Sequence, residues 1–219
     1  MKKKHYAVIG LGRFGIGVAT TLAAAGYEVL VIDSEEERIQ KISELFTHAV
    51  VADTTDEAAL KSLGIRNFDI VIVAIGHNIE ASVMTVLLLK ELGAPYIVAK
   101  ADSAIHGKML EKVGADRVVF PERDMGQRIA HNLVSTNVID YFEVAPDLGI
   151  IEVAVPENLI NSNLIEADLR SRYKITIIAI RRGAEMLLSP DPNEAFLQGD
   201  GLILVGDSSG IQRFESEYF

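Results

Sequence analysis

The sequence predicts an α/β protein, with a Rossmann-like doubly wound parallel sheet followed by a second, smaller α+β domain. Three observations carry this prediction. Over the first two thirds of the chain, short apolar strands alternate with helical segments. A glycine-rich loop, Gly10-x-Gly12-x-x-Gly15, follows the first strand, and an acidic residue, Asp33, ends the second. Beyond about residue 140 the alternation gives way to short strands separated by turn residues.

The first domain, residues 1–140, is expected to hold six strands, at 5–12, 28–33, 48–53, 68–76, 96–101 and 116–120. Helices are expected between them, at 15–27, 34–46 with Ser34 as its cap, 55–65, 79–93 and 106–115. The first, second and fourth strands are almost continuously apolar, as expected when helices cover both faces of a parallel sheet. The predicted strand order is therefore 3-2-1-4-5-6.

The second domain, residues 141–219, is expected to start near Asp140. An amphipathic helix at 122–135 leaves the first domain, since Met125, Ile129 and Leu133 recur at helical spacing. Beyond it we expect strands at 150–156, 175–183, 185–190 and 201–207 and one helix at 164–173. This pattern predicts a small α+β unit.

Charge and composition limit the kinds of partner and site that this chain is expected to have. The formal net charge is −10, and beyond the Lys2–Lys4 stretch, expected to be a solvated tail, no basic cluster stands out, so nucleic acid is a poor partner. No apolar run is long enough to span a bilayer, and the charged start runs straight into a strand, which favours a cytoplasmic protein. With no cysteine and no closely paired histidines, neither a thiolate nucleophile nor a metal site of those residues is indicated. The mean hydropathy of +0.23 hints at apolar surface buried between subunits.

The glycine loop lies where a dinucleotide or nucleotide phosphate would need it. Gly10 permits the tight turn, Gly12 lets the backbone approach a pyrophosphate, and Gly15 lets the helix pack closely on the strand. Asp33 follows Gly15 by 18 residues, and a carboxylate there accepts hydrogen bonds from ribose hydroxyls while repelling a 2′-phosphate. The alternative is that the glycines serve packing only.

Arg13, between the second and third glycines, would meet phosphate oxygens and would suit a ligand with more terminal phosphate charge than NAD; a solvated arginine is the alternative. Lys100, polar within an apolar strand, forms an ion pair or a ligand contact, or merely extends its ammonium to solvent. The remaining expected members of the site lie in the glycine loop or at the carboxyl ends of neighbouring strands. They are Phe14, Ser34, Asp53, Thr54, Ala74, Ile75, Gly76 and Asn78.

Little in the chain favours an enzyme. A dehydrogenase needs a second domain that brings an acid or base and a substrate clamp to the nicotinamide. Residues 141–219 contain no histidine, and Ser135 and Ser189 lack the glycine context of a nucleophile elbow. A small NAD-dependent dehydrogenase and an NAD(H)-sensing redox regulator remain the alternatives to a nucleotide-binding regulator.

Several segments carry a family resemblance over essentially the whole chain. They are "AVIGLGRFG", "VIDSEEERI", "HAVVADTTDEAALKSLGIRNFDIVIVAIG", "GADRVVFPERDMGQRIA" and "DGLILVGD". The chain resembles the regulatory subunits of bacterial potassium-uptake systems of the KtrA/KtrC type, the RCK family with TrkA-N and TrkA-C domains. The resemblance implies dimers that form an octameric ring at the inner face of the membrane, docked on an integral-membrane potassium transporter subunit of the KtrB/KtrD type.

The resemblance also implies ligands. ATP, favouring the conducting state, and ADP, favouring the inactive one, would compete for the glycine-loop site. Arg13 would contact the terminal phosphate of ATP and Asp33 the ribose. Glu122 would help to bind a divalent or monovalent cation, Mg²⁺ among the candidates, near that phosphate at a dimer interface; from the residues alone it is a carboxylate at a helix start.

In the second domain the resemblance implies a site for cyclic di-AMP at a two-fold interface, which would inhibit transport. The matching residues are Leu164, Ile165, Arg170 and Ile175, apolar walls for the bases with an arginine on the phosphates. The chain departs from the family pattern where close relatives often carry asparagine, since it has Thr176 preceded by Lys174. The alternative is that the apolar residues form a dimer core.

Overall fold

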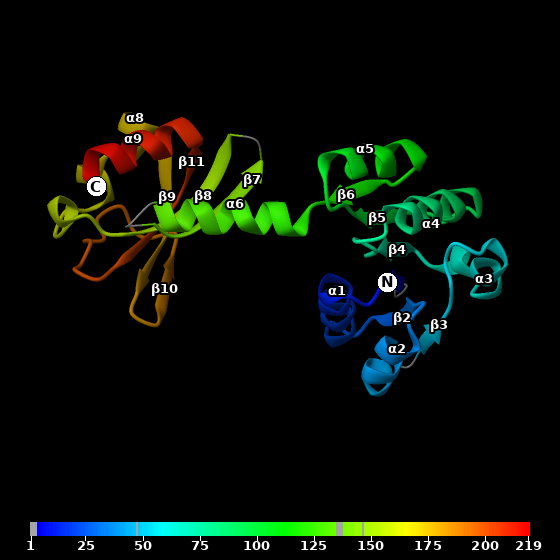
Figure 1. Ribbon diagram of the computed structural model, residues 1–219. Helices are drawn as coiled ribbons and strands as arrows, with labels where there is room; N and C mark the ends of the chain where they lie inside the picture. Colours follow the sequence, from blue (N-terminus) through cyan, green and yellow to red (C-terminus); the bar gives the residue numbers. More distant parts are fainter. Residues whose placement is uncertain (1–3, 47, 135–137, 146) are drawn as a thin grey trace. The chain divides into compact units, whose positions relative to one another are not determined.

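The computed structural model describes residues 4–46, 48–134, 138–145 and 147–219 (Figure 1). The chain divides into two compact units, Met1–Asp124 and Met125–Phe219. Lys2 and Lys3 of the expected tail, and Ser135 at the expected end of the amphipathic helix, lie outside the described residues. The boundary between the two units therefore lies before residue 140. The domain boundary expected near Asp140 stays a prediction.

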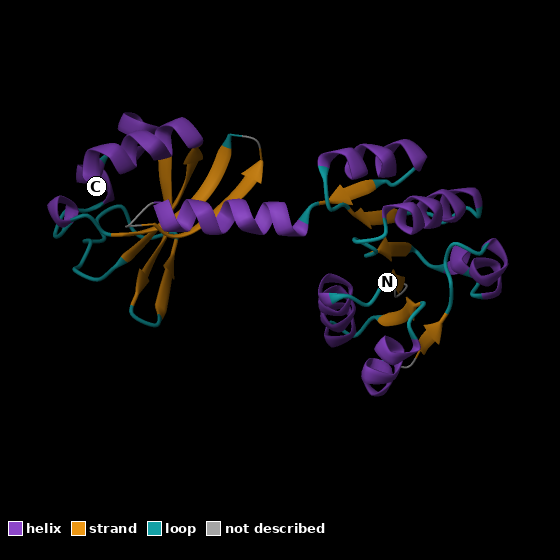
Figure 2. Cartoon of the chain, in the orientation of Figure 1, coloured by secondary structure: helices purple, strands orange, loops and turns teal. Residues whose placement is uncertain are grey.

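Unit 1 is built on a parallel sheet, as predicted (Figure 2). The strand order is β3-β2-β1-β4-β5-β6, and each neighbouring pair is parallel. The strands are β1 (His5–Ile9), β2 (Glu28–Asp33), β3 (His48–Val51), β4 (Ile70–Val73), β5 (Ile97–Lys100) and β6 (Arg117–Val119). The order reverses between β1 and β4, and in such sheets ligands bind at the carboxyl ends of the strands beside that point.

Helices cover both faces of this sheet. They are α1 (Arg13–Ala24), α2 (Glu36–Ile42), α3 (Glu57–Ser62), α4 (Ile79–Glu91) and α5 (Ala104–Val113), and α6 (Pro121–Val134) runs from unit 1 into unit 2. Val8 of β1 packs in one apolar cluster with residues of α1 and α2, while its neighbour Ile9 packs in another with residues of α3, α4 and α5. The alternation along each strand explains why nearly every strand residue is apolar.

Ser34 does not cap the second helix, contrary to expectation. The helix α2 begins at Glu36, its N-cap residue is Glu35, and no side chain caps it. The backbone N–H of Glu35 instead donates to Asp33 Oδ1 at 2.9 Å. The carboxylate that ends β2 therefore holds the turn that a serine was expected to hold.

Two glycines hold α1 against the sheet. Gly10 has a φ of +91°, a left-handed conformation that residues with side chains rarely adopt. A Cβ on Gly15 would lie 1.9 Å from the carbonyl oxygen of Gly10, far inside the 3.0 Å below which real Cβ atoms essentially never contact another heavy atom to which they are not bonded. The first turn of α1 can therefore sit on the end of β1 only because position 15 has no side chain.

Unit 2 contains an antiparallel sheet of order β10-β9-β11-β8-β7. Its strands are β7 (Val138–Ala145), β8 (Leu148–Ala154), β9 (Ile175–Arg182), β10 (Glu185–Leu188) and β11 (Gly201–Asp207). Short helices α7 (Leu164–Ala167) and α8 (Leu169–Tyr173) and the longer α9 (Ser208–Tyr218) pack on it. Phe214 of α9 is fully buried in the same apolar cluster as Leu204 of β11 and Tyr173 of α8.

The helices of unit 2 differ from expectation. The segment 164–173 is two short helices, because Asp168 between them takes a left-handed φ of 42°. The strand β7 and the helix α9 were not predicted. The start of α9 is marked by Asp207, whose carboxylate accepts the N–H of Gly210, and Ile211, Phe214 and Tyr218 recur at helical spacing.

Within the described ranges, none of the helices is both long and apolar enough to cross a bilayer.

The contact at Gly15 gives a first testable prediction. We expect Gly15→Ala to lower the free energy of unfolding by at least about 2 kcal/mol, because the added methyl group would push α1 off the backbone of Gly10. Urea unfolding followed by circular dichroism measures this change. The matched control is Gly17→Ala, two residues along the same helix, where a Cβ meets nothing within 4 Å. That variant should gain about 0.5–1 kcal/mol; equal effects at both positions would contradict the close-packing role.

Candidate functional site

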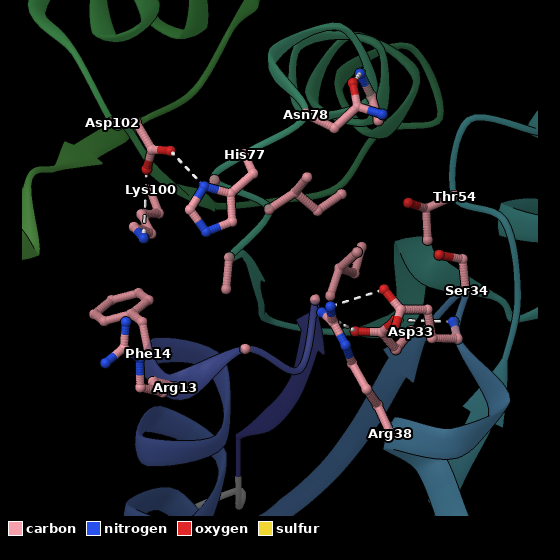
Figure 3. Close-up of a pocket in the computed structure, with 18 of the residues that line it drawn as sticks. Arg13, Phe14, Asp33, Ser34, Arg38, Thr54, His77, Asn78, Lys100 and Asp102 are labelled. Carbon is pink, nitrogen blue, oxygen red and sulfur yellow. Dashed lines mark hydrogen bonds and ion pairs between the residues drawn. The ribbon is translucent and has the colours of Figure 1, made fainter.

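A cleft of about 620 Å³ opens at the carboxyl ends of the strands of unit 1 (Figure 3). Its size is typical of small-molecule sites. The walls come from the glycine loop, the ends of β2 to β5 and the starts of α1, α4 and α6. Asp33, Ser34 and Arg38 lie on one side of the cleft in Figure 3, and Arg13 and Phe14 lie on the other.

Asp33 is the best-held carboxylate of the cleft. It is 5% exposed, and Oδ2 accepts the backbone N–H of Leu11 at 2.6 Å while Oδ1 accepts that of Glu35. The guanidinium of Arg38 lies 3.5 Å from Oδ2 and 2.7 Å from Glu35 Oε1. Asp33 thus fixes the glycine loop to the start of α2, and because each carboxylate oxygen can accept two hydrogen bonds, it keeps acceptor capacity for a ligand.

The amino terminus of α1 faces the cleft from the other side. Gly12 is its N-cap residue and no side chain caps the helix, so its first-turn N–H groups are left for a ligand or solvent. A Cβ on Gly12 would meet nothing within 4 Å, which shows that open space lies against the backbone there. Arg13 is exposed at this end. A helix amino terminus beside a guanidinium suits an anion such as phosphate.

Lys100 lies at the end of β5, 8% exposed, between two carboxylates. Its Nζ donates to Glu122 Oε1 at 2.7 Å and lies 3.4 Å from Asp102 Oδ1. Burial alone would lower the pKa of Lys100, but the hydrogen bond to Glu122 and the attraction of both carboxylates outweigh it and raise that pKa. Of the alternatives left open by the sequence, the structure shows the ion pair.

Glu122 lies in the first turn of α6 with its side chain largely exposed. The hydrogen bond from Lys100 lowers the pKa of its carboxyl, with a smaller contribution from Arg13. Among the described residues no group of three or more histidine, aspartate or glutamate side chains could hold a metal ion. A cation beside Glu122 would need further ligands from bound phosphates or another chain, so this role stays a prediction.

The polar residues at the other strand ends already have partners. Asn78 caps α4, since its Oδ1 accepts the N–H of Ala81 at 3.0 Å. Thr54 is buried and its hydroxyl lies 2.9 Å from that of Thr85. Asp53 accepts the hydroxyl and the N–H of Thr55, and these bonds lower the pKa of its carboxyl. These groups shape the rim of the cleft, and contact with a ligand would be an additional role.

Fourteen of the residues expected in the first domain line this cleft together. They are Gly10, Gly12, Arg13, Phe14, Asp33, Ser34, Asp53, Thr54, Ala74, Ile75, Gly76, Asn78, Lys100 and Glu122. Gly15 does not line it and is instead buried in the first turn of α1, against the backbone of Gly10. Sequence reasoning missed Ile9, Glu35, Arg38, Ala52, Thr55, His77, Ala81 and Asp102. For Asp102 a signal existed, because it follows the end of β5 just as Asp33 ends β2.

The residues implied for cyclic di-AMP lie in α7, in α8 and at the start of β9. Ile165 is 61% exposed and Arg170 is exposed, whereas Leu164 packs partly on the core. Ile175 is fully buried in the core of unit 2, so its side chain lines no surface of this chain. A cyclic di-AMP site at Leu164, Ile165, Arg170 and Ile175 stays a prediction; in this chain Ile175 packs in the core, and Ile165 and Arg170 are exposed.

Comparison with known proteins agrees with the architecture. Residues 6–121 match the TrkA-N domain and residues 150–218 the TrkA-C domain. The chain is 48% identical to Ktr system potassium uptake protein C of Bacillus subtilis (strain 168), covering 97% of this chain and 96% of that protein. Ktr system potassium uptake protein A of the same organism is 45% identical, with 99% and 98% covered. The crystal structure of the GsuK RCK domain shares the fold, with a TM-score of 0.69 at 18% identity over 99% of this chain and 48% of that one.

The Lys100 ion pair gives a second prediction. The lowered pKa of Glu122 contributes stability that is present above the unfolded pKa of about 4.3 and is lost as pH falls through the folded pKa. In Lys100→Met the pKa of Glu122 should rise toward its ordinary value. The free energy of unfolding, measured in urea at about pH 7 and pH 4, should therefore fall less on acidification than in the wild type.

The control for this measurement is Lys112→Met, at an exposed position of α5 that does not line the cleft. That variant should keep the wild-type dependence on pH. If both variants lose the same stability between the two pH values, the ion pair of Lys100 with Glu122 does not set the pKa of this carboxyl.

Proposed function

The chain belongs to the family of proteins built from a TrkA-N and a TrkA-C domain, and on that premise we propose that it is a regulatory subunit of a membrane potassium-uptake system. It would bind ATP or ADP in the cleft of unit 1 and catalyse no reaction. Its role would be to regulate the transport system according to which nucleotide is bound. The similarity to two Ktr system potassium uptake proteins over nearly the full chain supports the transport role.

The observation that carries the nucleotide proposal is the polarity of the cleft. At one end Asp33 is held by backbone N–H groups with acceptor capacity to spare, which suits ribose hydroxyls. At the other end the uncapped start of α1 and the exposed Arg13 suit phosphates. An adenosine nucleotide laid along the glycine loop would match both ends.

The cleft also suggests how two nucleotides could be told apart. A ligand shifts a conformational equilibrium only by its difference in affinity for the two states. ATP and ADP differ by one phosphate group, and Arg13 is exposed where a longer phosphate chain would extend past the start of α1. Contact of Arg13 with the terminal phosphate, from the same chain or a second copy, would supply that difference without breaking a bond.

The remaining parts of the proposal extend to partners. The subunit would form dimers and an octameric ring docked on a transporter subunit of the KtrB/KtrD type at the cytoplasmic face of the membrane. Cyclic di-AMP would bind near Ile165 and Arg170 of the TrkA-C domain. NAD(H) is a second candidate ligand, because it presents the same ribose hydroxyls to Asp33.

Calorimetric titration of the purified full chain with ATP, ADP, NADH and cyclic di-AMP, with light scattering on the same samples, tests this function. Micromolar or tighter binding of ATP and ADP to an assembly larger than a dimer, with weaker binding of NADH, is the expected result. Tight NADH binding with no preference for adenosine di- or triphosphate would instead indicate a redox sensor.

We expect Arg13→Ala to weaken ATP binding about tenfold or more and ADP binding by less than about threefold, because the guanidinium is placed for the terminal phosphate. Isothermal titration calorimetry of both nucleotides measures the difference. Arg66→Ala, an exposed arginine of unit 1 that does not line the cleft, is the matched control and should change neither affinity. Equal losses for ATP and ADP in Arg13→Ala would remove the proposed discrimination.

Asp33→Asn, unlike Arg13→Ala, should weaken the binding of ATP and of ADP alike. Asparagine keeps one acceptor oxygen but turns the other into a donor, which would face an N–H group of Leu11 or Glu35. We expect ATP and ADP to weaken by similar factors, about tenfold, since both carry the same ribose. The readout is the ratio of the two dissociation constants. Unchanged affinities in a folded variant would exclude Asp33 from the site.

A further inference from the structure

A fully buried histidine ties two walls of the cleft together. His106, on α5, is 0% exposed. Its Nδ1 accepts the backbone N–H of Asp102 at 3.3 Å, and its Nε2 lies 3.2 Å from the hydroxyl oxygen of Ser82 on α4. Asp102 lines the cleft, and so does Ala81, the neighbour of Ser82. The imidazole does not touch the cleft itself, but both of its partners belong to segments that form it.

These contacts fix the protonation state of the ring. A nitrogen that accepts an N–H bond carries no proton, so Nδ1 is unprotonated. Nε2 then carries the hydrogen and donates it to Ser82. The structure therefore requires neutral His106, and burial, partly offset by the charge of Asp102, lowers its pKa in the same direction.

Asp102 connects His106 to the end of the cleft where phosphates are proposed to bind. Its carboxylate lies 3.4 Å from Lys100 Nζ and 3.8 Å from Nδ1 of the exposed His77 (Figure 3). A Cβ on Gly76 would lie 2.7 Å from Asp102 Oδ1, so the carboxylate is packed against the backbone that follows β4. Movement of Asp102 would therefore displace Lys100 and the Gly76 wall together.

We propose that His106 is a positioning residue through which proton concentration controls the affinity of the cleft for nucleotide. A proton on Nδ1 would place two donors, the ring N–H and the Asp102 N–H, against each other. It would also create a cation beside the Asp102 carboxylate and draw that carboxylate away from Lys100 and Gly76. The ligand-binding arrangement holds only while His106 is neutral, so affinity falls as pH falls.

The charged surroundings of His106 are simple. Among the described residues, Asp102 in the loop after β5 is the group whose charge acts on the ring. From α4 the ring is faced by Ser82, which does not titrate, and the backbone N–H of His106 is bound to Ser103 Oγ. His77 is a second titratable group near Asp102, but it is fully exposed, so any test must separate the two histidines.

The inference rests on the proposed function, because the cleft must bind nucleotide. The test is calorimetric titration of the full chain with ADP at about pH 7.5 and pH 5.0, the lower value lying below the ordinary titration range of histidine because burial lowers the pKa of His106. His106→Asn places an amide oxygen near Nδ1, which accepts the Asp102 N–H at both pH values. We expect wild-type affinity to fall about fivefold more on acidification than that of His106→Asn. Protonation of the ADP phosphate affects every variant equally.

Two matched variants isolate the proton on His106. His77→Gln removes the exposed histidine and should keep the wild-type pH dependence. Ser82→Ala removes the contact with α4 and should keep it as well, even if affinity drops at both pH values. If His106→Asn does not fold, His106→Gln, whose amide reaches toward Ser82, serves as the second non-titrating variant.

The outcomes separate the two proposals. A wild-type chain that binds no adenine nucleotide at pH 7.5 overturns the proposed function and this inference with it. A wild-type chain that binds ADP, but with a pH dependence shared by His106→Asn or abolished in His77→Gln, overturns the role of His106 alone. The proposal stands when the additional, about fivefold loss of affinity on acidification is absent from the His106 variants and persists in His77→Gln and Ser82→Ala.

Discussion

The missing side chain at Gly15 is the constraint on which the cleft depends. The first turn of α1 lies so close to the end of β1 that even one methyl group would overlap the carbonyl oxygen of Gly10. Because the helix can start there, its N–H groups face the space beside the strand ends. Asp33 then fixes the same loop from the opposite side through the N–H of Leu11. The two ends of the cleft that are proposed to hold the phosphates and the ribose are thus both positioned by one short backbone segment.

Charge is distributed unevenly along the cleft. At the end of the cleft proposed for the ribose, Asp33 and Asp53 accept backbone N–H groups or hydroxyls, and Arg38 forms ion pairs with Asp33 and Glu35. At the other end Lys100 is already shared by Asp102 and Glu122. A bound polyphosphate would compete with those carboxylates for Lys100. Because Glu122 lies in the first turn of α6, that competition would act on the helix that runs from unit 1 into unit 2.

Unit 2 is stabilised independently of this cleft. Its core joins the sheet to α8 and α9 through buried aromatic and aliphatic side chains such as Tyr173 and Phe214. An ion-pair network also links β9 to the segment before β11, since the partly exposed Arg182 donates to Glu194 and to the buried Asp200. A separate core is consistent with a chain whose two domains each match a family of their own.

The sequence by itself determined the parallel sheet, its strand order and most of the cleft. Those features follow from local signals: apolar runs of strand length, glycines at a fixed spacing and polar residues where strands end. Helix boundaries such as that of α2 were less well determined, because Asp33 competed with Ser34 for the same turn. The helix α9 was not predicted, although Asp207 is a capping residue and the apolar residues after it recur at helical spacing.

Only the tertiary structure decided which polar groups meet. Lys100 and Glu122 are 22 residues apart, and Ser82 and His106 are 24 apart, so no local pattern could pair them. Their contacts exist because β5, α4, α5 and the start of α6 converge at one edge of the sheet. Burial was likewise decided by packing, since Ile175 and Ile165 are the same residue type, yet one is in the core and the other is exposed. The sequence specifies the residues, and the fold determines their neighbours and thereby their charge states.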